Sequence, residues 1–149
     1  MASALKVIFF GASGMVGAAV LDECLNNPNV SAVLAVGRSS TGRTHAKLTE
    51  LIHVDLFDLS PVVEKLQGYN ACFYTVGITS VGMKEADYAK LTVDMTRAVA
   101  TAVLQANPAI AMVFVSGASS DSTEQGKVMW ARIKGKAENL LLKMPFGSV

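Results

Sequence analysis

The sequence predicts a doubly wound α/β fold, in which helices cover both faces of a parallel sheet. Short apolar runs alternate with amphipathic stretches along the chain, which is the pattern of βαβ units. The composition is 51% hydrophobic and 17% charged, as is typical of sheets buried on both faces. The length favours one domain, residues 1–149.

The first half of the chain predicts three strands and two helices. Residues 4–10 form an apolar run, and a helical pattern then spans 15–27, where a following proline ends it. The apolar runs 31–37 and 51–55 predict the second and third strands. A second helix is predicted over 60–68, because a proline stands in its first turn and a glycine at its end.

The second half predicts two further strands, 70–77 and 110–117, and two helices. The last helix runs from about residue 125 to 143, and residues 146–149 are the first of a truncated sixth strand. The long helix, 84–106, carries an apolar stripe with helical spacing. The stripe consists of Leu91, Met95, Val99, Ala102 and Val103.

This order of elements predicts how the sheet is arranged. Right-handed crossovers place the five complete strands in the order 3-2-1-4-5. Ligands of such sheets bind outside the carboxyl ends of the strands, where the order reverses between the first and fourth. Residues that follow these strands are therefore the candidates for a binding site.

Charge and composition exclude several classes of partner. The net charge is +1 and there is no basic run, so neither nucleic acid nor an anionic membrane is expected as a partner. Cys24 and Cys72 lack metal-ligand spacing, so no metal site is predicted, and buried free thiols indicate a reducing compartment. No signal peptide or membrane-spanning run is evident, which predicts a soluble cytoplasmic protein.

The stretch GASGMVG lies between the first strand and the first helix. Gly11 allows a tight turn, Gly14 lets the backbone approach a pyrophosphate, and Gly17 lets the helix pack close to the strand. The helix N-terminus then offers free N–H groups to the phosphates. This context predicts a bound dinucleotide, whereas a glycine-rich turn without a ligand is the alternative. The predicted phosphate-binding residues are Gly11, Ala12, Ser13, Gly14, Met15, Val16 and Gly17.

The residues after the second strand predict which dinucleotide is preferred. An acidic residue there would bind the ribose 2′-hydroxyl of NAD, but this chain has Gly37, Arg38 and Ser39. A guanidinium suits a 2′-phosphate, so Arg38 predicts NADP(H) in preference to NAD(H). A solvated surface arginine is the alternative.

Two further strand ends complete the predicted cofactor site. Asp55, with Leu56 beside it, ends the predicted third strand, where a carboxylate could accept a hydrogen bond from the adenine amino group. A local cap is the alternative for Asp55. Val76 and Gly77 end the fourth strand and would bring backbone against the adenosine ribose.

Together with the stretch WARIKGKAENLLLKMPF, these motifs resemble the short-chain dehydrogenase/reductase superfamily. The chain is most similar to its atypical, extended-like branch of NAD(P)-binding proteins with epimerase or dehydratase names. The resemblance covers essentially all 149 residues and implies a Rossmann fold. It also implies a small carbonyl or a nucleotide-sugar-like substrate.

The family's catalytic set consists of Ser, Tyr and Lys. By resemblance the Lys corresponds to Lys134, which would also hold the nicotinamide ribose, and the Ser corresponds to Ser116, Ser119 or Ser120. Trp130 stands at the position of the Tyr. An indole N–H donates a hydrogen bond but cannot shuttle a proton near neutral pH. The usual acid/base is therefore absent.

Three interpretations of Trp130 remain open. In the first, the protein binds NADP(H) without hydride chemistry and acts as a sensor or regulatory module. In the second, a substitute such as Tyr74 or Tyr88 makes it an active NADP-dependent oxidoreductase or epimerase. In the third, the indole is a packing and stacking residue.

The polar stretch 121–127 is predicted to be a mobile loop over the site. By resemblance, family members continue beyond the sixth strand into a small substrate-binding region, so we expect much of the substrate pocket to be absent from these 149 residues. The outer edge of the fifth strand then loses its neighbour. An unpaired apolar edge favours pairing with another chain, so we expect self-association, as in a homo-oligomer, or poor solubility.

Overall fold

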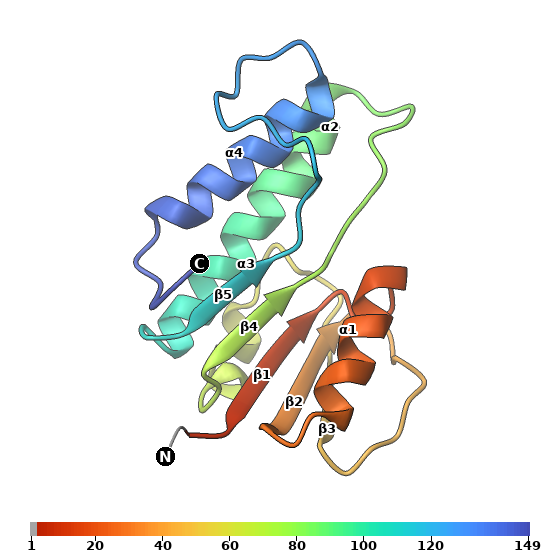
Figure 1. Ribbon diagram of the computed structural model, residues 1–149, viewed down its shortest axis with the longest axis vertical. Helices are drawn as coiled ribbons and strands as arrows, with labels where there is room; N and C mark the ends of the chain where they lie inside the picture. Colours follow the sequence, from red (N-terminus) through yellow and green to blue (C-terminus); the bar gives the residue numbers. More distant parts are fainter. Residues whose placement is uncertain (1–2) are drawn as a thin grey trace.

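The structure, a computed structural model that describes residues 3–149, has a five-stranded parallel sheet as its middle layer (Figure 1). The strand order is β3-β2-β1-β4-β5, which confirms the predicted order and the parallel direction. The strands are β1 (Leu5–Phe10), β2 (Val30–Gly37), β3 (Leu48–Ile52), β4 (Ala71–Tyr74) and β5 (Ala111–Phe114).

Helical elements cover both faces of this sheet, which confirms the predicted three-layer, doubly wound arrangement (Figure 1). Helix α1 (Met15–Asn26) packs on one face. The opposite face carries the 3-10 helix η1 (Ser60–Leu66) and two longer helical stretches. These are α2 (Glu85–Ala89), η2 (Lys90–Asp94) and α3 (Met95–Ala106), which follow without a break, and α4 (Met129–Lys143).

The residues of β1 show why the sheet is buried on both sides. Val7 and Phe9 pack with the α1 cluster, whereas Ile8 and Phe10 pack with the cluster under η1, α3 and α4. All four side chains are fully buried, and such burial contributes about 1.5–3 kcal/mol for each large apolar side chain. A continuous apolar run, rather than an alternating one, is the expected sequence of such a strand.

Two elements differ from their predicted bounds near the carboxyl ends of the strands. Strand β3 ends at Ile52, where it pairs with Gly37, and Val54 within the predicted strand is 74% exposed. Helix α4 begins at Met129 rather than near residue 125. The Asp121 carboxylate accepts hydrogen bonds from the backbone N–H groups of Thr123 and Gly126, and it thereby holds the preceding residues in a turn.

Two predicted helices also have unexpected internal geometry. The stretch predicted as helix 60–68 is the 3-10 helix η1. The long helix is continuous over its predicted length, but η2 within it is a π-helical turn. Such turns widen a helix locally and are frequent at functional sites. Residues after it, Val99, Ala102 and Val103, are buried as predicted, whereas Leu91 and Met95 are only half-buried.

The predicted start of a sixth strand is a single parallel bridge between Ser148 and Ala111. The Gly147 N–H donates to the Ile110 carbonyl (3.0 Å), and the Met112 N–H donates to the Ser148 carbonyl (2.8 Å). Within residues 3–149, no helix is both long enough and apolar enough to cross a membrane.

Candidate functional site

A cavity of about 500 Å³ opens at the carboxyl ends of the strands, beside the point where the sheet order reverses between β1 and β4. This volume lies in the range of small-molecule and cofactor sites. The loop after β1, the end of β2, the segment after β4 and the π-helical turn all contribute to its wall. The predicted residues that line it are Gly11, Ala12, Ser13, Gly14, Met15, Val16, Arg38, Leu56, Val76 and Gly77.

The three glycines of the loop after β1 have different structural roles. Gly11 has φ of 89°, and a Cβ there would lie 2.6 Å from the Thr75 hydroxyl. A Cβ on Gly17 would overlap the Gly11 carbonyl, so this glycine permits close packing without lining the cavity. A Cβ on Gly14, by contrast, has no neighbour nearer than 3.6 Å, because this residue faces open space.

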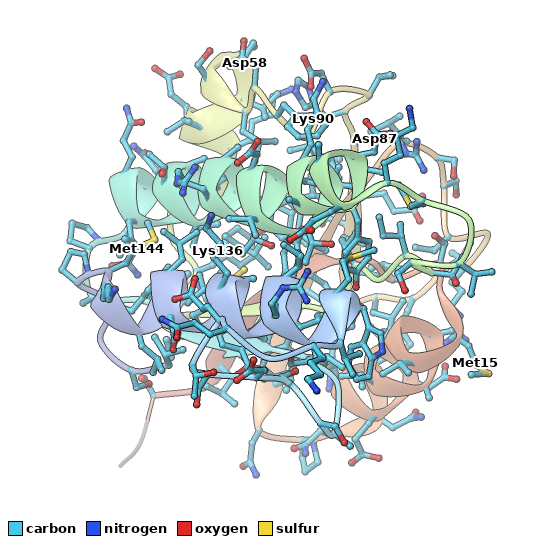
Figure 2. All side chains as sticks on the ribbon, turned by 90° about the horizontal axis from the view of Figure 1, so that it is seen from above. Met15, Asp58, Asp87, Lys90, Lys136 and Met144 are labelled. Atoms are coloured by element: carbon cyan, nitrogen blue, oxygen red, sulfur yellow. The ribbon has the colours of Figure 1, made fainter. Side chains whose placement is uncertain are left out.

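Gly14 is also the N-cap of α1, so the first N–H groups of this helix face the cavity without a partner inside the helix. Free N–H groups and a positive helix end favour an anion. Met15, in the first turn, is 90% exposed and points away from the body of the protein (Figure 2). Val16, which follows Met15, is 47% exposed, so two apolar side chains of the first turn lie at the rim of the cavity.

Thr75 fixes this loop against β4. Its hydroxyl is 3.0 Å from each of the carbonyl oxygens of Phe10 and Gly11, to which it donates. Thr75 also lines the cavity. The sequence alone does not identify it, because only the pairing of β1 with β4 brings it to a loop that lies 64 residues away.

The segment after β2 presents Arg38 to the cavity. Arg38 is exposed, and no carboxylate among residues 3–149 lies within 4.0 Å of its guanidinium. Arg43, in contrast, is paired with Asp22 on α1. An acid does lie near this segment, because the carboxylate of Glu50 on β3 accepts hydrogen bonds from Ser40 and Thr41.

Asp55 lies outside the cavity wall, although its neighbour Leu56 lines it. The Asp55 carboxylate accepts a hydrogen bond from the Phe57 N–H (2.9 Å). Asp55 therefore has a local role, as in the alternative of a local cap, although the hydrogen bond closes a turn. The carboxylate sits three residues beyond the end of β3, in a turn rather than at a strand end.

A second, small cavity of about 10 Å³ adjoins the first, since Val76, Ile78 and Leu91 line both. Lys134 on α4 borders it, with its ammonium 5.6 Å from the centre of the Phe114 ring. Burial lowers the pKa of Lys134, and the nearby Glu138 carboxylate acts in the opposite direction. The sequence does not identify Phe114, which lies at the end of β5, as a site residue.

The two tyrosines considered as substitutes differ in their positions. Tyr74 is 1% exposed, borders the small cavity and stacks on Phe114 at 5.7 Å between ring centres. Burial raises the pKa of Tyr74, and the Thr96 hydroxyl partly opposes this. Tyr88 is 2% exposed, packs against Ile133 and borders neither cavity.

Trp130 lies one turn before Lys134 and packs over the segment after β5. A Cβ on Gly117 would lie 2.8 Å from the indole ring. The hydroxyls of Ser116 and Ser120 are 2.9 Å apart, and Ser120 donates to the Gly117 carbonyl (2.8 Å). Neither Trp130 nor any of the predicted serines, Ser116, Ser119 and Ser120, borders either cavity.

The polar loop 121–127 is fastened to α4 and lines neither cavity. The Asp121 N–H donates to the Ala131 carbonyl (2.9 Å), and the Asn139 amide donates to the Ser122 carbonyl (2.8 Å). A Cβ on Gly135 would overlap the backbone of Asp121, so the loop backbone touches the helix backbone.

Comparison with known proteins adds the family. The sequence model described as the NAD dependent epimerase/dehydratase family matches residues 7–128, which include most of β1, the glycine loop and β5. No curated protein matches this chain.

Solved structures share the fold at low sequence identity. The glucuronic acid dehydrogenase of Chromohalobacter salexigens is 16% identical, with a TM-score of 0.74 over 97% of this chain and 58% of that chain. The Bordetella bronchiseptica enzyme WbmG, solved with NAD, is 14% identical, with a TM-score of 0.74 over 98% and 52%. The UDP-glucose 4-epimerase of Thermotoga maritima, solved with UDP-glucose, is 17% identical, with a TM-score of 0.70 over 93% and 50%. This chain therefore spans about half the length of these structures.

Proposed function

This chain belongs to the NAD dependent epimerase/dehydratase family, and from that premise we propose that it binds NADP(H) in the large cavity and prefers it to NAD(H). One observation carries the proposal. A single cavity of about 500 Å³ joins the glycine loop, the N-terminus of α1 and the unpaired Arg38. In a dinucleotide the anionic pyrophosphate is joined to the adenosine ribose, so one bound molecule would contact both the glycine loop and Arg38.

The residues that line the two cavities fit NADP(H). Gly14 leaves room where backbone would meet a pyrophosphate, and the first N–H groups of α1 would donate to it. Arg38 would bind the 2′-phosphate, because a guanidinium forms charge-assisted, bidentate hydrogen bonds with phosphate oxygens. Lys134 borders the adjoining cavity and would donate to the hydroxyls of the nicotinamide ribose.

We further propose that hydride chemistry is impaired or altered in this protein. The nicotinamide would supply hydride transfer, but such a reaction also requires a group that moves a proton at the substrate. The indole of Trp130 cannot do so, and it packs on Gly117 outside both cavities. This supports a protein that senses NADP(H) or presents a surface to a protein partner.

The second candidate function is an active oxidoreductase or epimerase that acts on a small carbonyl or a nucleotide sugar. Tyr74 is the observation in its favour, because its ring borders the same small cavity as Lys134. Burial raises the Tyr74 pKa, however, so the phenol holds its proton more firmly than a free tyrosine. A general acid/base works best with a pKa near the working pH, which favours the first candidate.

Titration of the purified chain with NADPH and NADH tests the proposed binding. We expect NADPH to bind at least about tenfold more tightly, because the Arg38–phosphate contact is made only with NADPH. Fluorescence of Trp130, the single tryptophan, reports binding, and energy transfer to the bound nicotinamide reports their proximity. Equal affinity for the two nucleotides would contradict the preference, and no binding of either would contradict the whole proposal.

Replacing Trp130 with tyrosine tests the proposed loss of chemistry. We expect no turnover by the unaltered chain. Slow reduction of NADP⁺ with glucuronic acid by the Trp130→Tyr variant would show that the rest of the site is competent, because a phenol can pass a proton. The growth of nicotinamide absorbance measures the reaction. Trp130→Phe is the matched control, since it has the same ring without the hydroxyl. Turnover by the unaltered chain would instead support the second candidate.

A further inference from the structure

The segment after β2 is held in one shape by a carboxylate from the neighbouring strand. We call residues 38–43 the Arg38 loop. In the β2–β3 pairing Glu50 lies opposite Ala35, three residues before this loop, and its side chain contacts Ser40 and Thr41. The Glu50 carboxylate accepts the Thr41 N–H (2.7 Å) and the Ser40 hydroxyl (2.7 Å), and it also accepts the Thr41 hydroxyl.

The same hydroxyls hold the next residues of the loop. The Gly42 N–H donates to the Ser40 hydroxyl oxygen (3.0 Å), and the Arg43 N–H donates to the Thr41 hydroxyl oxygen (3.2 Å). Arg43 in turn is paired with Asp22 on α1. The Arg38 loop is therefore fastened to β3 on one side and to α1 on the other.

Two polar side chains of this loop make no hydrogen bond or ion pair with the residues that the structure describes. Neither the Arg38 guanidinium nor the Ser39 hydroxyl has a hydrogen-bond or ion-pair partner within residues 3–149. Both residues line the large cavity. Ser40, Thr41 and Arg43 each make a hydrogen bond or an ion pair inside the protein, so Arg38 and Ser39 are the two polar side chains of the loop without an internal partner among residues 3–149.

We propose that Glu50 is a positioning residue that sets the preference for NADP(H), because it holds the Arg38 loop in the shape that presents Arg38 and Ser39 to a 2′-phosphate. This inference rests on the proposed function and names the residue that would determine its specificity. A loop that is already ordered loses less conformational entropy when it binds. The hydrogen bonds from Thr41 and Ser40 lower the pKa of Glu50, so the carboxylate stays ionised at neutral pH and keeps all three donors.

Electrostatics alone predicts the opposite effect. Glu50 places a negative charge near the proposed phosphate, so its removal should strengthen NADPH binding if charge were the main influence. Positioning predicts that removal weakens NADPH binding, because the loop loses three hydrogen bonds and both side chains lose their orientation. The sign of the change therefore distinguishes the two explanations.

The test is the ratio of the NADH and NADPH dissociation constants in Glu50→Ala. We expect the NADPH dissociation constant to rise about tenfold while that of NADH changes less than about threefold, because NADH makes no contact with the Arg38 guanidinium. Glu50→Gln, which keeps an acceptor oxygen for Thr41, should give an intermediate ratio. Glu64→Ala is the matched control, because it removes the same charge from an exposed residue whose side chain makes no hydrogen bond in the part of the chain that the structure describes, and it should leave the ratio unchanged.

Each result has a defined meaning. A ratio that is unchanged or increased in Glu50→Ala overturns the inference, as does an equal loss of affinity for both nucleotides. If Glu50→Ala does not fold, the ratio in Glu50→Gln decides in the same way. An unaltered chain that binds neither nucleotide overturns the proposed function itself, and this outcome is recognised before any variant is measured.

Discussion

Gly17→Ala is expected to destabilise the protein by about 3 kcal/mol, the upper part of the range for an overpacked site. The added Cβ would overlap the Gly11 carbonyl and lie 2.7 Å from the Thr75 hydroxyl. The Gly11 carbonyl belongs to backbone that Thr75 already holds by a hydrogen bond, so it cannot move aside cheaply. For a domain of this size the melting temperature should fall by about 6–12 °C. Thermal unfolding followed by circular dichroism measures the change.

Gly14→Ala in the same loop is the matched comparison. Its Cβ has no neighbour nearer than 3.6 Å and its φ is −74°, so the folded state accommodates it. We expect a smaller fall in melting temperature than for Gly17→Ala, because alanine is only a poorer N-cap than glycine. We also expect a large loss of nucleotide affinity, because the methyl group occupies the space proposed for the pyrophosphate. Gly77→Ala should leave stability unchanged, since nothing lies within 4 Å of its Cβ. Equal melting temperatures for Gly17→Ala and Gly14→Ala would contradict the packing argument.

Arg38→Glu is expected to reverse the nucleotide preference. The substitution removes charge-assisted hydrogen bonds to the 2′-phosphate, which contribute about 1.5–3 kcal/mol, and it adds repulsion. NADPH affinity should therefore fall about a hundredfold. NADH affinity should be kept or should rise, because a carboxylate at this position can accept a hydrogen bond from the ribose 2′-hydroxyl. Parallel titrations with the two nucleotides measure both constants.

The control for Arg38→Glu is a charge reversal elsewhere. Lys136 is exposed on α4 and makes no ion pair within residues 3–149. Lys136→Glu changes the net charge by the same amount, so it should shift both affinities little and equally. If Arg38→Glu behaves like Lys136→Glu, Arg38 is a solvated surface residue, and the proposed preference for NADP(H) is wrong.

Local signals allowed much of the fold to be predicted. The continuous apolar run of β1 and the stripe of Val99, Ala102 and Val103 reveal buried surfaces through residues that are close in sequence. The signal of the glycine loop is also local, because Gly11 and Gly17 are both required by the same strand-to-helix turn. Strand order followed from the sequence of elements, since crossovers of one hand leave few arrangements.

The bounds of the elements were predicted less well where the same residues are compatible with either a regular element or a turn. The apolar run 51–55 satisfies a strand pattern, yet pairing with β2 ends β3 at Ile52. The residues before Met129 are compatible with a helix, but the Gly126 N–H donates to the Asp121 carboxylate and not to a helical carbonyl. Side-chain hydrogen bonds of this kind compete with helix formation, and composition does not show which will form.

The sequence by itself determined the doubly wound fold, the glycine loop and the presence of Arg38 after β2. Those features depend on the order of residues within one strand, one turn or one helix. Only the tertiary structure decided what surrounds them: Thr75 on the Gly11 carbonyl, Glu50 on the Arg38 loop, and Phe114 beneath the Lys134 ammonium. Each of these contacts joins different elements, and Thr75 lies 64 residues from Gly11. Such contacts exist only after strands have paired, because pairing, not sequence proximity, sets which side chains meet.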